Sequence, residues 1–173
     1  MSENSLPGSF EQLALPLFDQ LYNFACWLTQ DRQEAEDLVQ ETYTKALKGF
    51  GSFQPGTNFR AWIYRILRNT FLTSRTGLRT VVPLDFEGED EKLPASGETP
   101  ESILLGQFDR QLVRDALDRL PVAHREVILL CDVEEMSYQE ISQALSIPMG
   151  TVMSRLSRAR QALRRTIHAM QKG

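Results

Sequence analysis

The stretch Ser137-Tyr138-Gln139-Glu140-Ile141-Ser142-Gln143-Ala144-Leu145-Ser146-Ile147-Pro148-Met149-Gly150-Thr151-Val152 decides the fold of the C-terminal half. It predicts one helix from Ser137 to Leu145 and a second from about Met149 to Met170, separated by a turn of three or four residues. Helices joined in this way have the geometry of a helix-turn-helix. Ile141, Leu145 and Ile147 are expected to pack against the apolar stripe of the second helix, which comprises Val152, Leu156, Ala159 and Leu163.

The opposite face of the second helix is polar and basic. A recognition helix uses short polar side chains and arginines at its front to reach base edges in the major groove, and cations further along hold phosphates. We therefore expect this face to bind DNA through Thr151, Ser154, Arg155, Arg158, Arg160 and Arg164, with Arg165 beside them. The alternative is a solvated basic helix in an ordinary helical bundle.

Upstream of the helix-turn-helix, apolar residues recur at helical spacing on both sides of Pro121. They predict a helix from about Phe108 to Leu120 and another from Val122 to Cys131. The preceding segment, Val81 to Glu101, carries seven acids and one lysine with three prolines, and it shows neither helical nor strand periodicity. We interpret it as a flexible acidic linker.

The N-terminal third also predicts helices only. Apolar residues at steps of three and four mark a helix over 10–28, in which Pro16 indicates either a kink or the true start. Asp31 is expected to cap a second helix that ends at Gly49. A turn-rich loop, 49–58, then leads to a third helix that begins near Asn58. The predicted fold is all-α, with helical domains at 1–80 and 107–173 joined by a linker at 81–106.

Charge is segregated along the chain, although the net charge is only −4. Residues 42–84 hold seven basic side chains and no acid, and residues 141–173 hold six basic side chains and no acid. Two acid-free blocks in an acidic protein are typical of surfaces that bind phosphate backbones.

Several other classes of protein are disfavoured. The N-terminus has no signal-peptide pattern and no apolar run is long enough to span a membrane, which favours a cytoplasmic protein. Cys26 and Cys131 are far apart within apolar helical patterns, and we interpret both as reduced packing residues, although a redox role stays open. His124 and His168 are isolated, so no metal or other cofactor is expected. We find no phosphate loop and no catalytic grouping, so an enzyme is disfavoured.

The motifs of the C-terminal half resemble region 4 of the sigma-70 family. The resemblance rests on Arg119-Leu120-Pro121 followed by Arg125-Glu126-Val127-Ile128-Leu129-Leu130, on Ser137-Tyr138-Gln139-Glu140-Ile141, and on Gly150-Thr151-Val152-Met153-Ser154-Arg155-Leu156-Ser157-Arg158-Ala159-Arg160. It implies that this half binds the minus-35 promoter element and docks on the beta flap of core RNA polymerase.

The N-terminal half carries two further motifs of the same family, in the same order. Ala35-Glu36-Asp37-Leu38-Val39-Gln40-Glu41-Thr42-Tyr43 is similar to region 2.2, and Asn58-Phe59-Arg60-Ala61-Trp62-Ile63-Tyr64-Arg65-Ile66-Leu67-Arg68-Asn69 is similar to regions 2.3 and 2.4. The resemblance implies that Asp37, Gln40 and Glu41 bind the beta-prime clamp. It also implies a pocket for a flipped minus-10 base at Phe53 and Asn69, with backbone contacts from Arg60, Arg65 and Arg68. Phe53 is equally well explained as a core residue.

No segment between the domains is long enough for region 3 of a housekeeping sigma factor, so the chain resembles the compact extracytoplasmic-function branch. That branch implies an anti-sigma partner and a linker that threads through polymerase near the nascent RNA. Two alternatives remain, a conventional helix-turn-helix regulator that acts without polymerase and a protein-interaction module that does not read DNA. The first predicts a dimerisation or ligand-sensing domain at 10–80, and the second leaves the basic block 141–173 unexplained.

Overall fold

The computed structural model describes residues 9–76 and 109–172, and among these it contains helices and no strand. The predicted linker at 81–106 and Phe108 lie outside the described residues. The chain divides into two compact units, built mainly from the residues before and after position 80 respectively. No helix in the described ranges has both the length and the apolar character needed to cross a membrane.

The first unit begins with a helix that is interrupted at Pro16. Helix α1 spans Phe10–Ala14, a 3-10 turn η1 spans Leu15–Leu17, and α2 spans Phe18–Thr29. Proline removes a backbone donor and clashes with the preceding turn, which explains why the regular α-helix stops there. The sequence left a kink and a later start open at Pro16, and the structure has a short 3-10 turn between two helices.

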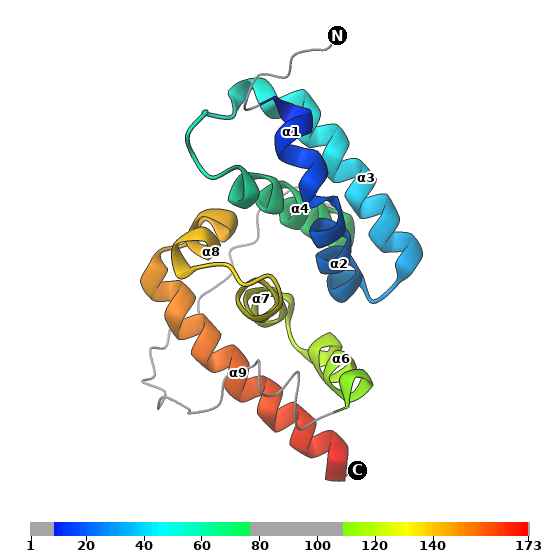
Figure 1. Cartoon of the computed structure of the whole chain (residues 1–173). Helices are drawn as coiled ribbons and strands as arrows, with labels where there is room; N and C mark the ends of the chain where they lie inside the picture. Colours follow the sequence, from blue (N-terminus) through cyan, green and yellow to red (C-terminus); the bar gives the residue numbers. More distant parts are fainter. Residues whose placement is uncertain (1–8, 77–108, 173) are drawn as a thin grey trace. The chain divides into compact units, whose positions relative to one another are not determined.

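Helix α3 (Arg32–Gly49) folds back along α2, and α4 (Phe59–Thr76) crosses both (Figure 1). Asp31 caps α3 as predicted, because its side chain accepts a hydrogen bond from the Glu34 N–H at 3.0 Å. The 3-10 turn η2 (Phe50–Ser52) follows α3 directly. The centre of this unit is filled by fully buried side chains from three helices, namely Leu21, Phe24, Leu28, Val39, Ile63, Tyr64, Leu67 and Phe71.

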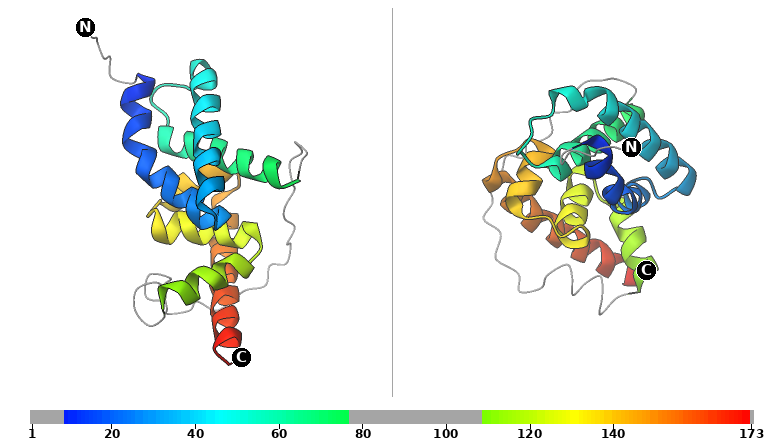
Figure 2. Two further views of the ribbon diagram at one scale, coloured as in Figure 1. Left: turned by 90° about the vertical axis from the view of Figure 1, so that its right-hand side faces the viewer. Right: turned by 45° about the horizontal axis from the view of Figure 1, so that its top comes forward.

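The second unit is organised on one long helix. It comprises α6 (Arg110–Arg119), α7 (Val122–Ile128) with a π turn η4 (Leu129–Val133), α8 (Tyr138–Leu145) and α9 (Met149–Lys172). Both α6 and α7 pack on α9, and Figure 2 shows them crossing it. The predicted apolar stripe is confirmed, since Val152, Leu156, Ala159 and Leu163 of α9 are all buried, and Ile167 extends it.

Arg125 holds α6 and α7 together from inside this unit. Its side chain is 8% exposed and donates to three main-chain carbonyls at the end of α6, those of Leu117 at 3.0 Å, Asp118 at 3.3 Å and Leu120 at 3.1 Å. The last four carbonyls of a helix lack their regular partners four residues on, although that of Leu117 also accepts from the Leu120 N–H at 3.1 Å. A buried guanidinium with several donors satisfies them together, and this fixes the corner at Pro121.

Candidate nucleic-acid interface

The helix-turn-helix is set by a capping box at its first helix. The Ser137 hydroxyl accepts from the Glu140 N–H at 3.1 Å, and the Glu140 carboxylate accepts from the Ser137 N–H at 3.2 Å. The turn places Ser146 at φ 60°, in the left-handed region. The Ile147 N–H then donates to the Ser142 carbonyl at 3.1 Å, which closes the end of α8. The predicted turn between the two helices is therefore confirmed.

The front of α9 presents small polar groups and one cation on its outer face. Ser154 is exposed, whereas Thr151 and Arg158 are half-buried, and the three follow each other at helical spacings of three and four. The Arg158 guanidinium lies along the helix, 3.5 Å from the Ser154 carbonyl. Met153, which the sequence analysis did not select, is 50% exposed beside them. This face is chemically suited to base edges, with hydroxyls, one arginine and one apolar side chain for a thymine methyl.

Two predicted contacts on α9 lie toward the inside of the unit instead. Arg155 is only 5% exposed. Arg160 pairs with the Asp132 carboxylate at 3.5 Å and contacts the Cys131 sulfur at 3.9 Å, with side-chain exposures of 23% for Arg160 and 7% for Asp132. Arg160 therefore links α9 to η4, and Arg155 is buried within the unit. Arg164 is half-buried and Arg165 is exposed.

The groups that contact the inner side of α9 have shifted pKa values. Burial lowers the pKa of His124, and the positive charges of Arg155, Arg158 and Arg165 lower it further. Burial, followed by the Asp132 carboxylate, raises the pKa of the Cys131 thiol to about 11. The Cys131 thiol is therefore protonated near neutral pH, which makes it a poor nucleophile. The described residues contain no group of three or more metal-binding side chains.

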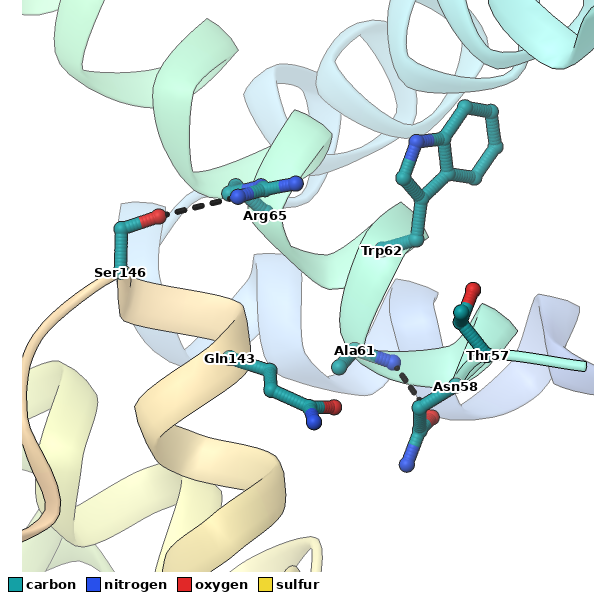
Figure 3. Close-up of a pocket in the computed structure, with 7 residues that line it drawn as sticks. All are labelled: Thr57, Asn58, Ala61, Trp62, Arg65, Gln143 and Ser146. Carbon is teal, nitrogen blue, oxygen red and sulfur yellow. Dashed lines mark hydrogen bonds between the residues drawn. The ribbon is translucent and has the colours of Figure 1, made fainter. Parts of the chain in front are cut away.

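Helix α4 presents a mixed aromatic and polar face in the first unit. The Asn58 side chain caps it by accepting from the Ala61 N–H at 2.9 Å (Figure 3). Trp62, Arg65 and Asn69 follow at steps of three and four, so they share one face. Trp62 and Arg65 are half-buried and Asn69 is exposed.

Of the other two predicted cations of α4, Arg60 lies away from that face, whereas Arg68, three residues after Arg65, borders it. Arg60 lies one turn before Tyr64, with its guanidinium carbon 6.0 Å from the ring centroid, and is half-buried. Arg68 is also half-buried and precedes Asn69 on the helix. Within α4, Arg65 is therefore the predicted cation that lies in line with Asn69.

Phe53 belongs to an aromatic cluster formed by Phe10, Phe50, Phe53, Phe59 and Trp62. Its ring centroid lies 5.1 Å from that of Trp62 and 5.3 Å from that of Phe59, in tilted and edge-on arrangements. Phe53 is half-buried. Its packing favours the interpretation as a core residue, which the sequence had left open.

The third predicted surface lies on α3, where Asp37, Gln40 and Glu41 are all exposed. Asp37 and Glu41 line a cleft of about 210 Å³ between α3 and α4. Gln40 lies further round the helix, on the side of the exposed Leu47. The cleft also includes Glu34, Thr70, Phe71 and Ser74, none of which the sequence analysis selected, because the two helices that form it come together only in the folded unit.

Comparison with known proteins finds matches over both units. The family model for sigma-70 region 2 matches residues 16–80, and the model for sigma-70 region 4 matches residues 110–163. The chain is 38% identical over 160 residues to the ECF RNA polymerase sigma factor SigE of Mycolicibacterium smegmatis, covering 90% of this chain and 60% of that protein. It is 35% identical over 160 residues to the ECF RNA polymerase sigma factor EcfG of Rhodopseudomonas palustris, covering 91% of this chain and 84% of that protein.

A similar solved structure is the sigma factor RpoE from Bartonella quintana in complex with the anti-sigma factor NepR. It superposes with a TM-score of 0.68 at 30% identity and covers 92% of this chain and 96% of that one. Sequence motifs, family models and fold thus agree over both helical units.

Proposed function

We propose that this chain, which belongs to the extracytoplasmic-function group of the sigma-70 family, binds core RNA polymerase and directs it to specific promoters. The observation that carries the proposal is that regions 2 and 4 both match, in the family's order. We assign polymerase binding and melting of the minus-10 element to residues 1–80. Residues 81–106 are assigned as the acidic linker, and residues 107–173 are assigned to reading the minus-35 element.

Reading of the minus-35 element is assigned to the outer face of α9. Thr151, Ser154 and Arg158 lie at helical spacing near the front of the helix, where a recognition helix meets base edges. Arg164 and the exposed Arg165 are placed further along and suit phosphate contacts. Arg155 and Arg160 are assigned an indirect role, because Arg155 is buried and Arg160 pairs with Asp132.

Melting of the minus-10 element is assigned to the loop 50–58 and the outer face of α4. Asn69 offers donors and an acceptor for a base edge, Arg65 supplies charge for the strand, and Trp62 and Phe53 supply aromatic surface. Arg68 is adjacent to this face and is assigned a backbone contact. Arg60, beside Tyr64, is assigned to packing rather than to the strand.

Polymerase binding is assigned to α3, through Asp37, Gln40 and Glu41 at the beta-prime clamp, and to the second unit at the beta flap. The protein works in the cytoplasm with polymerase and is itself no enzyme.

The solved relative RpoE was captured with the anti-sigma factor NepR, which supports an anti-sigma partner for this chain too. Neither binding site alone is expected to hold a promoter, because two domains lose entropy when their separation is fixed, and polymerase fixes that separation.

The test is run-off transcription of fragmented host DNA by purified core polymerase, with and without the chain, followed by mapping of the new 5′ ends. Discrete starts that share two upstream elements are expected. Arg158→Ala should weaken transcription through the upstream element, by about 1–3 kcal/mol if the arginine reads a guanine. Asn69→Ala should impair opening while core binding is retained, and Glu41→Lys should lose core binding.

Two results would count against the proposal. Equal losses of core affinity in all three variants would contradict the division of roles. Absence of new starts, together with tight DNA binding by the chain alone, would favour a conventional helix-turn-helix regulator.

A further inference from the structure

Exposed apolar side chains of the second unit are concentrated at its helix-turn-helix. Among the described residues of this unit, the large apolar side chains that are exposed are Tyr138, Met149 and Met153. Tyr138 begins α8, and the two methionines lie in the first two turns of α9. Single exposed apolar residues are common on protein surfaces, but three within one motif indicate that this end of the unit contacts another surface.

The helix that carries Met153 has cations but no acid. Residues 141–173 hold six basic side chains and no acidic one, so a partner of this surface is expected to be polyanionic. DNA has that charge, and its major groove also presents an apolar group, the C5 methyl of thymine. A surface that combines cations, hydroxyls and a methionine is therefore suited to a major groove that contains thymine.

Met153 lies on one edge of the outer face of α9. Successive residues of a helix are separated by about 100°, so Met153 and Arg158 lie on opposite sides of Ser154. Met153 is 50% exposed, and Ser154 is exposed beside it. Met153 and Arg158 are therefore directed to different positions of the groove, one with an apolar group and the other with a cation.

Gly150 leaves the helix without a side chain next to this edge. It precedes Met153 by three residues and Ser154 by four, so it shares the outer face with them. A Cβ at this position would meet nothing within 4 Å apart from its neighbours in the helix. Packing therefore does not require glycine here, whereas a missing side chain lets a ligand approach the backbone closely. Close approach brings the flexible methionine side chain to a base edge.

We propose that Met153 is a specificity-determining residue of the minus-35 contact, and that it selects a thymine by packing on the C5 methyl group. The inference rests on the proposed function, because it concerns the helix face assigned to the minus-35 element. Met153 adds a base identity that Ser154 and Arg158 do not supply, since their hydrogen-bonding groups do not detect a methyl group. Burial of one methyl group changes affinity by about fourfold.

The test uses single deoxyuridine substitutions, which remove only the C5 methyl group from a thymine. In a promoter mapped by run-off transcription, each thymine of the upstream element is replaced in turn, on either strand. The modified and unmodified promoters then compete for a limiting amount of core polymerase loaded with the full chain, and the transcripts are counted. Three forms of the chain are compared, namely the unmodified protein, Met153→Gln and Met153→Leu. Glutamine keeps the length of the side chain but replaces the thioether by an amide, whereas leucine keeps it apolar.

One thymine of the upstream element should be sensitive to loss of its methyl group. With the unmodified chain and with Met153→Leu, the deoxyuridine promoter should compete about fourfold less well, and with Met153→Gln by less than twofold. The proposal is overturned if no thymine of the upstream element is sensitive. It is also overturned if Met153→Gln keeps the full sensitivity, since another side chain would then contact the methyl group.

Unchanged circular dichroism at 222 nm shows that both variants are folded. If the unmodified chain produces no discrete starts with core polymerase, the proposed function itself fails. That result is distinct from an active chain that does not distinguish thymine from deoxyuridine.

Discussion

Replacement of Arg125 by methionine should unfold the second unit selectively. The guanidinium donates to the carbonyls of Leu117, Asp118 and Leu120, and the first and third of these residues are buried. Methionine fills a similar space but donates nothing. A hydrogen bond from a charged group is worth about 1.5–3 kcal/mol, and two such bonds to buried carbonyls would be lost. We expect a destabilisation of about 3–6 kcal/mol, which is a large part of the stability of a small domain.

The two tryptophans of the chain make this prediction measurable, because both Trp27 and Trp62 lie in the first unit. Tryptophan emission therefore follows the first unit alone, whereas circular dichroism at 222 nm follows both. In Arg125→Met the dichroism melt should gain a transition that is lower by more than about 10 °C, since 1 kcal/mol corresponds to about 4–8 °C for a domain of this size. The emission melt should not move. Arg125→Lys keeps the charge but has a single ammonium, so it should lose about half as much.

Two outcomes would refute this reasoning. A loss below about 1 kcal/mol would mean that water or neighbouring groups satisfy the α6 carbonyls once Arg125 is gone. An equal shift of the emission and dichroism melts would mean that the two units unfold as one, and then the effect could not be assigned to the second unit.

Three further predictions concern single side chains. Asn58→Ala should remove the cap of α4 and destabilise the first unit by about 1 kcal/mol in emission-monitored denaturation, whereas Asn58→Asp should retain most of that stability. The pKa of the Cys131 thiol is raised to about 11, so at pH 7.5 Cys131 should react with a disulfide reagent only as the second unit opens. Rapid labelling of the native protein would show that Asp132 and Arg160 do not hold the thiol as described. Burial lowers the pKa of His124 in the folded chain, so above pH 6.5 the residue does not contribute to the pH dependence of stability. As the pH falls through 6.5, the unfolded chain binds a proton at His124 that the folded chain does not bind. The second unit therefore loses stability. His124→Gln should reduce that loss in dichroism-monitored denaturation at pH 5.5 relative to pH 7.5, and an unreduced loss would exclude His124 as its source.

The helices themselves were predictable because each one carries a stripe of apolar residues with a period near 3.6. The cap at Asp31, the end of α3 at Gly49 and the break at Pro121 also follow from local chemistry. The π turn that ends α7 was not predicted, and at Pro16 the sequence predicted an interruption of the helix but not its 3-10 form.

The roles of the long basic side chains were the least predictable from sequence. Helical spacing places Arg155 and Arg158 on one face and Arg160 nearly opposite, yet it does not say which residues of another helix lie beside each of them. Arg160 is held by Asp132, a residue 28 positions earlier, and Arg155 is buried while Arg158 is not. A count of basic residues therefore overestimates the surface available to DNA. The assignment of the basic helix α9 to DNA binding stays a prediction.

The aromatic cluster has a consequence for how relatives of this protein could diverge. Phe50 and Phe53 anchor the loop 50–58 on Phe59 and Trp62, and Gly56 provides its turn at φ 90°. The positions between the anchors, Gly51, Ser52, Gln54, Pro55 and Thr57, are all exposed. Under the role proposed for this loop at the minus-10 element, substitutions at these positions alter promoter preference without removing a buried ring contact, and so at little cost to folding.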